Sequence, residues 1–337
     1  MIRSCSVIIA ALISVFSLAF ARAESGYPSH PIKLIVSQGP GSTVDLAARM
    51  LATKFEELFR YQIIVLNREG AAGEIAKKEC AAASADGYTL CIIADGQAAV
   101  IPASYSAAKE PIPGADVSPI GFIGTHYFEF VVRKDLPDSF AGFVEYARKN
   151  PDTLVCGSAN PSGILGMAIL NGISGVKVRE ARYRQAEPLV HLDIRAGHID
   201  CMFSTTVTAL PHLKDGAIRA LGTLGPLKNP FLPDTLPLSE QGQDYAAFGK
   251  FGSWQALWGP PELPGETVAI LNKNLNKILD RPEVADRLAQ IGITVRRSST
   301  PEQLRAATDS LFLTVKELLC AHSLQEPITL NGRSCKR

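Results

Sequence analysis

The chain has 337 residues with 34 basic and 33 acidic side chains, and its formal net charge is +1. This near-neutral balance, without any block of lysine or arginine, excludes the charge pattern of a nucleic-acid-binding protein. The length exceeds what one hydrophobic core usually serves, so we expect two domains.

Residues 1–23 have the anatomy of a secretory signal peptide. Arg3 supplies a positive charge, residues 7–20 form an apolar run, and residues 21–23 offer small side chains for cleavage. The run is shorter than the roughly 20 residues needed to span a bilayer. We therefore expect cleavage and export to the periplasm, with an uncleaved anchor as the alternative. Cleavage removes Arg3 and Arg22 and leaves 32 basic against 33 acidic groups, a net charge of −1.

After this segment, short β-rich runs alternate with amphipathic helices. Strands are expected at residues 32–36, 62–66, 89–94, 119–124, 128–133, 153–157, 177–183, 199–203, 218–224 and 253–259. Helices between such strands argue for a parallel or mostly parallel sheet that is covered on both faces. The sequence therefore predicts an α/β protein. Residues 225–250, rich in proline and glycine, are expected to form a surface excursion and then return between domains.

The segment 32–58 contains the most informative turn. An apolar strand ends in the turn 38–43, and a helix follows in which Ser42 and Asp45 stand in capping-box relation. A turn of this kind leaves backbone N–H groups pointing into one small space, and the helix dipole favours negative charge there. The turn therefore predicts a ligand that is anionic or rich in carbonyl groups.

Signals for helix ends recur near the C-terminus. Pro282 is expected to open a helix, and Gly292 to close the turn after it. Thr300 and Gln303 form a second capping box, which leads a helix towards Cys320.

Six of the seven cysteines lie beyond the signal segment, where an oxidising compartment would let disulfides persist. Cys80 falls late in a helix and Cys91 in the next strand, so these two could meet. Cys320 and Cys335 flank the C-terminal tail and could pin it. The remaining two, Cys156 and Cys201, are expected to be buried small hydrophobes in strand interiors. No C-x-x-C spacing supports a zinc or redox site.

Catalytic and cofactor motifs are missing. There is no Gly-x-Ser-x-Gly elbow, the turn 39–42 lacks the lysine of a Walker motif, and residues 70–73 complete no dinucleotide fingerprint. His191 and His198 lie seven apart, but a turn is expected between them, which favours structural histidines over metal ligands. We expect neither an enzyme, nor a cofactor, nor a metal site.

Small, hydroxyl or amide residues follow four of the expected strands. The segments are Gly41–Ser42–Thr43, Asp95–Gly96–Gln97, the run 158–163 with Ser158, Asn160 and Ser162, and Ser204–Thr205–Thr206. One such segment usually just closes a loop. In open α/β sheets, however, ligands bind beyond the carboxyl ends of the strands. Four segments in successive strand–helix units therefore predict a shared cleft lined by hydrogen-bond donors.

Several motifs give the chain a family resemblance over about residues 27–319. They are Tyr-Pro-Ser-His-Pro-Ile at 27–32, Gly-Pro-Gly-Ser-Thr-Val-Asp at 39–45, Asn-Arg-Glu-Gly-Ala-Ala-Gly at 67–73, Asp-Gly-Tyr-Thr-Leu at 86–90, Ala-Gly-His-Ile-Asp at 196–200, Leu-Pro-His-Leu-Lys-Asp-Gly at 210–216 and Trp-Gln-Ala-Leu-Trp-Gly-Pro at 254–260. In this order and spacing, the chain resembles the tripartite tricarboxylate transporter substrate-binding proteins, also called Bug receptors.

The resemblance implies a type II periplasmic-binding-protein-like fold of two mixed-sheet α/β lobes that close on a small carboxylate. Lobe 1 would comprise residues 24–126 and 250–337, and lobe 2 residues 127–249. In the family, main-chain N–H groups hold the ligand carboxylate. The carry-over points to Gly41, Ser42, Thr43 and Asp45 in lobe 1 and to Ser158, Asn160 and Ser162 in lobe 2. With the strand-end segments, the expected ligand-binding set also includes Asp95, Gly96, Ser204 and Thr205.

The chain departs from the family pattern at several places. The first turn is bulkier than the usual glycine run. A frequent acidic residue is replaced within Ser204–Thr205–Thr206, which weakens the case for an amino-acid ligand because its ammonium group would need that carboxylate. Arg184 would favour an additional ligand carboxylate if it faces the cleft, and a solvated loop arginine is the alternative reading.

The resemblance and the donor-rich turns together imply an exported, monomeric solute-binding receptor. It would capture a small organic acid and deliver it to the integral-membrane subunits of a transporter. The alternative is a periplasmic sensing component that presents the loaded receptor to a signalling partner.

Overall fold

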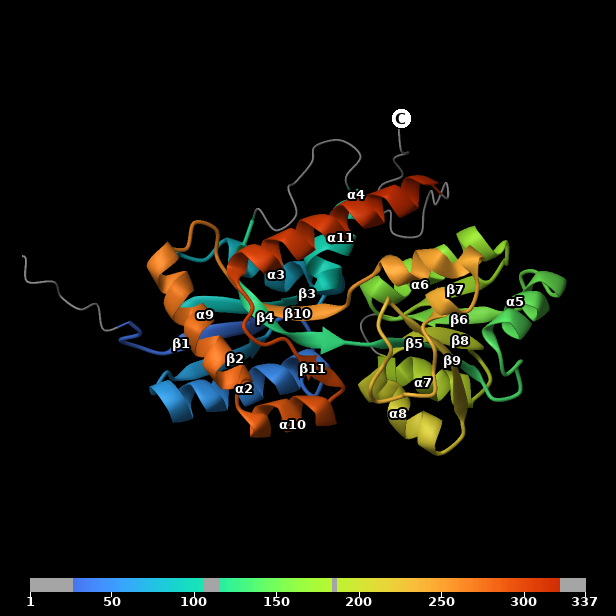
Figure 1. Ribbon diagram of the computed structural model, residues 1–337, viewed down its shortest axis with the longest axis horizontal. Helices are drawn as coiled ribbons and strands as arrows, with labels where there is room; N and C mark the ends of the chain where they lie inside the picture. The colour runs from blue at the N-terminus through green and yellow to red at the C-terminus, as the bar shows by residue number, and fades with distance from the viewer. Residues whose placement is uncertain (1–26, 106–115, 184–186, 322–337) are drawn as a thin grey trace, which may run out of the picture.

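The structure, a computed structural model, describes residues 27–105, 116–183 and 187–321. The expected signal peptide, Arg184 and the expected pairing of Cys320 with Cys335 lie outside this description. The described residues form two α/β lobes placed side by side along the long axis of the molecule (Figure 1).

Lobe 1 is built on a six-stranded mixed sheet in the order β11-β4-β10-β3-β1-β2. Its strands are β1 (Ile32–Val36), β2 (Ile63–Asn67), β3 (Thr89–Ala94), β4 (Ser118–His126), β10 (Trp254–Gly259) and β11 (Ile293–Val295). β1 is parallel to β2 and β3, whereas β10 is antiparallel to β3 and β4. The sheet was expected to be parallel or mostly parallel from the alternation of elements, and mixed from the resemblance; it is mixed.

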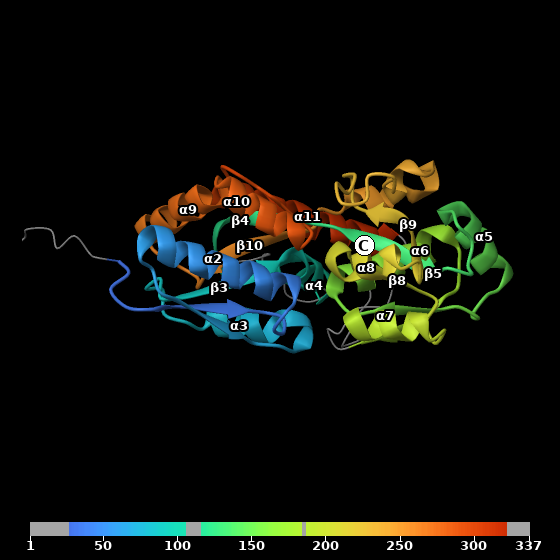
Figure 2. The same cartoon turned by 90° about the horizontal axis from the view of Figure 1, so that it is seen from below.

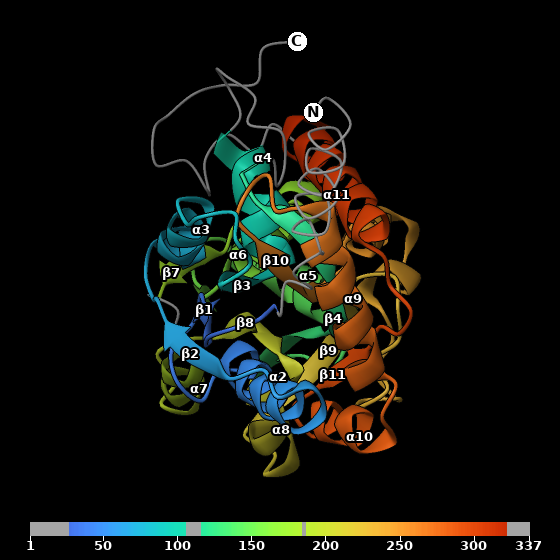
Figure 3. The same cartoon turned by 90° about the vertical axis from the view of Figure 1, so that its left-hand side faces the viewer.

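Alternation along β1 explains how helices cover both faces of this sheet. Leu34 packs with residues of α2 (Thr43–Phe59), α9 (Gly265–Leu279) and α10 (Pro282–Gln290). Its neighbour Ile35 packs on the other face with residues of α3 (Glu74–Ala81). Figure 3 shows α3 and α9 on opposite sides of the strands.

Lobe 2 is built on a five-stranded mixed sheet in the order β7-β6-β8-β5-β9. Its strands are β5 (Phe128–Arg133), β6 (Val155–Ser158), β7 (Arg179–Arg182), β8 (Cys201–Thr205) and β9 (Ile218–Leu224). One face packs on α5 (Phe140–Lys149) and α6 (Pro161–Ser174), and the other on α7 (Glu187–Arg195) and α8 (Thr206–Lys214).

Two connections and one helix join the lobes. The chain passes from β4 to β5 through Tyr127 alone, and it returns from β9 to β10 through residues 225–253. The return, which was expected to be irregular, contains the short helices η3 (Leu238–Glu240) and η4 (Gln243–Lys250). Helix α11 (Pro301–Ala321) packs Leu304 into the lobe 1 core. It packs Phe312 into the lobe 2 core (Figures 1 and 2).

The cysteines give one confirmation and one correction. Cys80 of α3 and Cys91 of β3 form the expected disulfide, with a Cα–Cα distance of 6.1 Å. Cys156 and Cys201 are fully buried, but they also form a disulfide, with a Cα–Cα distance of 4.5 Å. The expectation that they are only buried hydrophobes was wrong, because β6 and β8 are neighbours in register and place the two residues directly opposite.

Candidate functional site

A cavity of about 500 Å³ lies between the two lobes. Lobe 1 contributes the turn from Gln38 to Val44 and the start of the π-helical segment η2 (Gly96–Val100). Lobe 2 contributes the first residues of α6, α7 and α8. The cavity therefore lies where strands β1, β3, β6 and β8 end, as the strand-end segments predicted.

The lobe 1 turn is held in place by Asp45, which is 1% exposed. Its Oδ2 atom accepts from the Gly41 amide at 2.9 Å, and its backbone amide donates to the N-cap Ser42 Oγ at 3.2 Å. In a capping box the Asp45 carboxylate would accept from the Ser42 amide. Here it accepts from the amide of Gly41, one residue earlier. Burial alone would raise the pKa of Asp45, but hydrogen bonds from Arg49, Gly41 and Asn67 outweigh it and lower the pKa.

Where this turn enters α2, the donors it offers are the amides of Thr43 and Val44. The Gly41 amide is engaged by Asp45, and the Ser42 amide donates to the Gly39 carbonyl at 3.2 Å. No hydrogen bond within the described part of the chain uses the amides of Thr43 and Val44, the first two residues of α2. Both residues line the cavity. The positive end of the helix dipole thus faces the cavity with two N–H groups ready to bind an anion.

Asp95 connects the lobes at the back of the cavity. Its Oδ2 atom accepts from Ser162 Oγ of lobe 2 at 2.9 Å, and its Oδ1 atom accepts from the Trp254 amide at 3.3 Å. Burial raises the pKa of Asp95 to about 7, although these hydrogen bonds act in the opposite direction. His126 Nε2 lies 3.5 Å from Oδ1, and burial lowers the pKa of this histidine to about 4. His126 is therefore neutral at pH 7.

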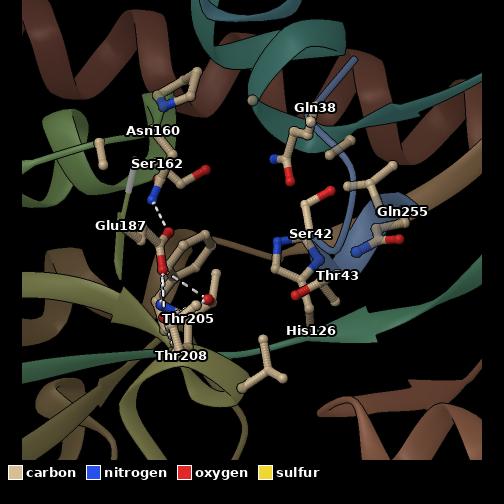
Figure 4. A pocket seen from close by; sticks show the side chains of 18 of the residues that line it. Gln38, Ser42, Thr43, His126, Asn160, Ser162, Glu187, Thr205, Thr208 and Gln255 are labelled. Carbon is tan, nitrogen blue, oxygen red and sulfur yellow. Dashed lines mark hydrogen bonds between the residues drawn. The ribbon is translucent and has the colours of Figure 1, made fainter. Parts of the chain in front are cut away.

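The lobe 2 wall is organised around Glu187, the first residue of α7. Its carboxylate accepts from Asn160 Nδ2 at 2.6 Å, from the Thr205 amide and hydroxyl at 3.1 and 2.7 Å, and from Thr208 Oγ1 at 2.6 Å. Figure 4 shows this group facing Gln38, Ser42 and Thr43 across the cavity. Phe128, Leu189 and Val207 give the cavity an apolar portion.

Most of the predicted ligand-binding residues line the cavity. They are Gly41, Ser42, Thr43, Asp95, Gly96, Asn160, Ser162 and Thr205. Three others lie behind the wall: Asp45 supports the turn, Ser158 is buried at the end of β6, and Ser204 bonds His191 Nε2 at 2.8 Å. Neighbouring strand residues point to opposite faces, so Ser204 turns away where Thr205 turns in.

Sequence reasoning missed the residue at the centre of the lobe 2 wall. Glu187 was overlooked because the prediction followed polar residues directly after strands and gave no bounds to the helix between the expected strands 177–183 and 199–203. The available signals were Pro188 directly after an acidic residue and the apolar spacing of Val190 and Ile194.

His191 and His198, the pair that could suggest a metal site, do not converge, and His191 instead stacks on His212 with ring centroids 4.6 Å apart. His191 is buried against Ser204, whereas His198 is exposed and lies 3.7 Å from Asp193. Across residues 27–105, 116–183 and 187–321, no group of three or more histidine, cysteine, aspartate or glutamate side chains is arranged to hold a metal ion.

Two lobes joined by crossing strands, with a donor-lined cavity between them, define a solute-binding protein of the periplasmic-binding-protein fold. The family model described as "Tripartite tricarboxylate transporter family receptor" matches residues 47–316. The chain belongs to this receptor family.

The chain is also similar to curated relatives and to solved structures. A UPF0065 protein encoded in the TAR-I ttuE-ttuC' intergenic region of Agrobacterium vitis is 29% identical over 276 residues, which cover 81% of this chain and 78% of that protein. The structure of the periplasmic binding protein BugD is 25% identical with a TM-score of 0.77, covering 88% of this chain and 99% of BugD. Rpa4515 of R. palustris, solved with adipate, is 24% identical with a TM-score of 0.79, covering 88% and 98%.

Proposed function

We propose that this receptor captures a small organic carboxylate between its lobes and delivers it to the membrane subunits of a tripartite tricarboxylate-type transporter. The observation that carries the proposal is the pair of unengaged amides, Thr43 and Val44, at the positive end of α2. The adipate bound to Rpa4515 is an acid of this class.

Closure would work through contacts that exist only when both lobes meet. Lobe 1 would hold the carboxylate on its amides, and lobe 2 would add contacts from the first residues of α6, α7 and α8. A ligand favours the closed state only to the extent of its additional contacts there. We place the lobe boundaries at 126/127 and 249/250, where the chain crosses between the two sheets.

The variant Thr43→Pro tests the carboxylate site. Thr43 is the first residue of α2, where proline is well tolerated, and Ser42 before it already has the extended conformation that precedes proline (φ −68°, ψ 161°). The substitution therefore removes one N–H donor and leaves the helix. We expect affinity for the carboxylate to fall roughly tenfold or more, as for a lost hydrogen bond to a charged group.

The measurement is calorimetry with the best acid from a thermal-shift screen of dicarboxylates, aromatic acids and amino acids. Thr43→Ala is the matched control, since it removes the side chain and keeps the amide. Equal affinities of wild type and Thr43→Pro would contradict the site, and a screen without any binding acid would contradict the function.

Delivery and export need cellular experiments. Within the described part of the chain, no helix has the length and apolarity needed to cross a bilayer. The signal-peptide pattern of residues 1–23 supports periplasmic localisation, which fractionation and N-terminal sequencing of the mature protein would test. Deletion of the gene should abolish uptake of the radiolabelled acid. Undiminished uptake with a lost transcriptional response would favour the sensing role instead.

A further inference from the structure

The lobe 2 wall of the cavity contains a carboxylate of the protein itself. Asn160 is the N-cap of α6 and Thr205 is the N-cap of α8, so two helix N-termini meet at this place. Such a place ordinarily favours an anion. Here the Glu187 carboxylate occupies the position of that anion and accepts hydrogen bonds from Asn160, Thr205 and Thr208.

A second carboxylate of a ligand would therefore meet an unfavourable wall. The side-chain donors of Asn160, Thr205 and Thr208 already serve Glu187. Among the described lining residues no lysine or arginine supplies a positive charge that could offset this carboxylate. Like charges brought together in such a site are strongly unfavourable.

The hydrogen-bond geometry of Glu187 leaves room for a donor instead. Three of its four hydrogen bonds end on Oε2, and only Asn160 donates to Oε1. A carboxylate has about four acceptor positions shared equally by its two oxygens. Oε1 therefore keeps an acceptor position, and Glu187 is partly exposed at the cavity.

We infer that Glu187 selects a zwitterionic ligand, a small amino acid whose carboxylate binds the Thr43 and Val44 amides while its ammonium group binds Glu187 Oε1. The inference rests on the proposed carboxylate site of lobe 1. The acidic residue that is missing from the 204–206 segment argued against an amino-acid ligand. Glu187 supplies a carboxylate to the cavity from α7 instead. Specificity here is a difference between two affinities, and Glu187 contributes to it chiefly by repelling a second acid group.

Matched ligand pairs test the inference, because each pair exchanges one carboxylate for an ammonium group. The pairs are β-alanine with succinate, 4-aminobutanoate with glutarate, and 5-aminopentanoate with adipate. Calorimetry on the full mature protein should show wild type binding at least one amino acid tenfold or more tightly than its diacid partner. In Glu187→Gln this ratio should fall at least tenfold.

Glu69→Gln is the matched control, since it removes another carboxyl group of the cavity without touching the lobe 2 donors. It should leave the ratio within about twofold of wild type, as expected for an exposed charge. If the affinity ratio changed equally in both variants, the selectivity would come from the general charge of the cavity and not from Glu187, and the inference would be overturned.

The wild-type result decides even if Glu187→Gln does not fold. Diacids that bind as tightly as their amino-acid partners overturn the inference and leave the receptor function standing. Binding of neither member of any pair at millimolar concentration also overturns it, and the broader acid screen then decides the receptor function separately.

Discussion

Glu129 shows how a single buried side chain can make stability depend on pH. It is fully buried in β5, and its Oε1 atom accepts from Thr206 and from Asn229, which is also fully buried. Burial raises the pKa of Glu129 to about 8, even though both hydrogen bonds act in the opposite direction. The folded protein therefore keeps a proton that the unfolded chain releases near the ordinary glutamate pKa of 4.5.

The sign of the effect follows from proton linkage. Because the pKa is raised on folding, the contribution to stability is complete below the unfolded pKa and is lost as pH rises through the folded pKa. We predict that wild type loses about 1 kcal/mol of unfolding free energy per pH unit, relative to Glu129→Gln, between about pH 5 and 7.5. Urea unfolding of both proteins across this range measures the difference. A constant difference would show that Glu129 is ionised throughout.

For individual residues, the sequence predicted the hydrogen-bonding side chains but not their partners. Ser42, Asn160 and Thr205 were predicted from their place after strands, and all three line the cavity. The Gly41 and Ser42 amides are already engaged, because the Asp45 side chain and the Gly39 carbonyl lie next to them in three dimensions. Such pairing is set by tertiary geometry, which residue type and spacing alone do not encode.

The two disulfides act at the scale of single elements. Cys80–Cys91 ties α3 to β3 across a separation of 11 residues, and Cys156–Cys201 ties β6 to β8 across 45. In the chain-entropy model, a longer loop restrains the unfolded state more. We predict that Cys80→Ala with Cys91→Ala costs about 3 kcal/mol and that Cys156→Ala with Cys201→Ala costs about 4 kcal/mol.

Denaturant unfolding of the two double variants tests this order. Reduced wild type, unfolded under the same conditions, is the control because it lacks both bonds and should be the least stable of the three. If reduction leaves the stability of wild type unchanged, the loop argument does not hold for this protein.

Elements were predictable where local chemistry defines their ends. Thr300 and Gln303 exchange the two hydrogen bonds of a capping box, at 3.0 and 3.2 Å, as expected. Strands β1, β3, β5 and β9 have the predicted bounds, because each is an apolar run closed by turn residues. Strand β11 was missed since it has only three residues and forms by pairing with β4, a partner distant in sequence. The pairing of Cys156 with Cys201 was missed for the same reason.

For the whole molecule, the two-lobed fold followed from the resemblance, and the contacts between the lobes could be found only in the structure. The most direct contact is the interlobe latch, the hydrogen bond from Ser162 of lobe 2 to Asp95 of lobe 1. Gly96 reinforces it by close packing, since a Cβ atom there would lie 3.1 Å from the Cβ of Pro161. Both partners of the latch are more than nine-tenths buried. We expect the bond to break when the lobes open.

Removing the latch should shift the molecule towards an open state. Ser162→Ala leaves the buried Asp95 Oδ2 without its donor, a loss of roughly 1–2 kcal/mol that falls on the closed state alone. We therefore predict a larger radius of gyration in X-ray scattering without ligand and an affinity for the carboxylate reduced roughly 5- to 30-fold. Ser158→Ala is the matched control, because the Ser158 hydroxyl is equally buried and has no hydrogen-bond partner among the described residues. Equal losses in both variants would mean that alanine merely loosens lobe 2, whereas a loss confined to Ser162→Ala assigns the energy of closure to this contact.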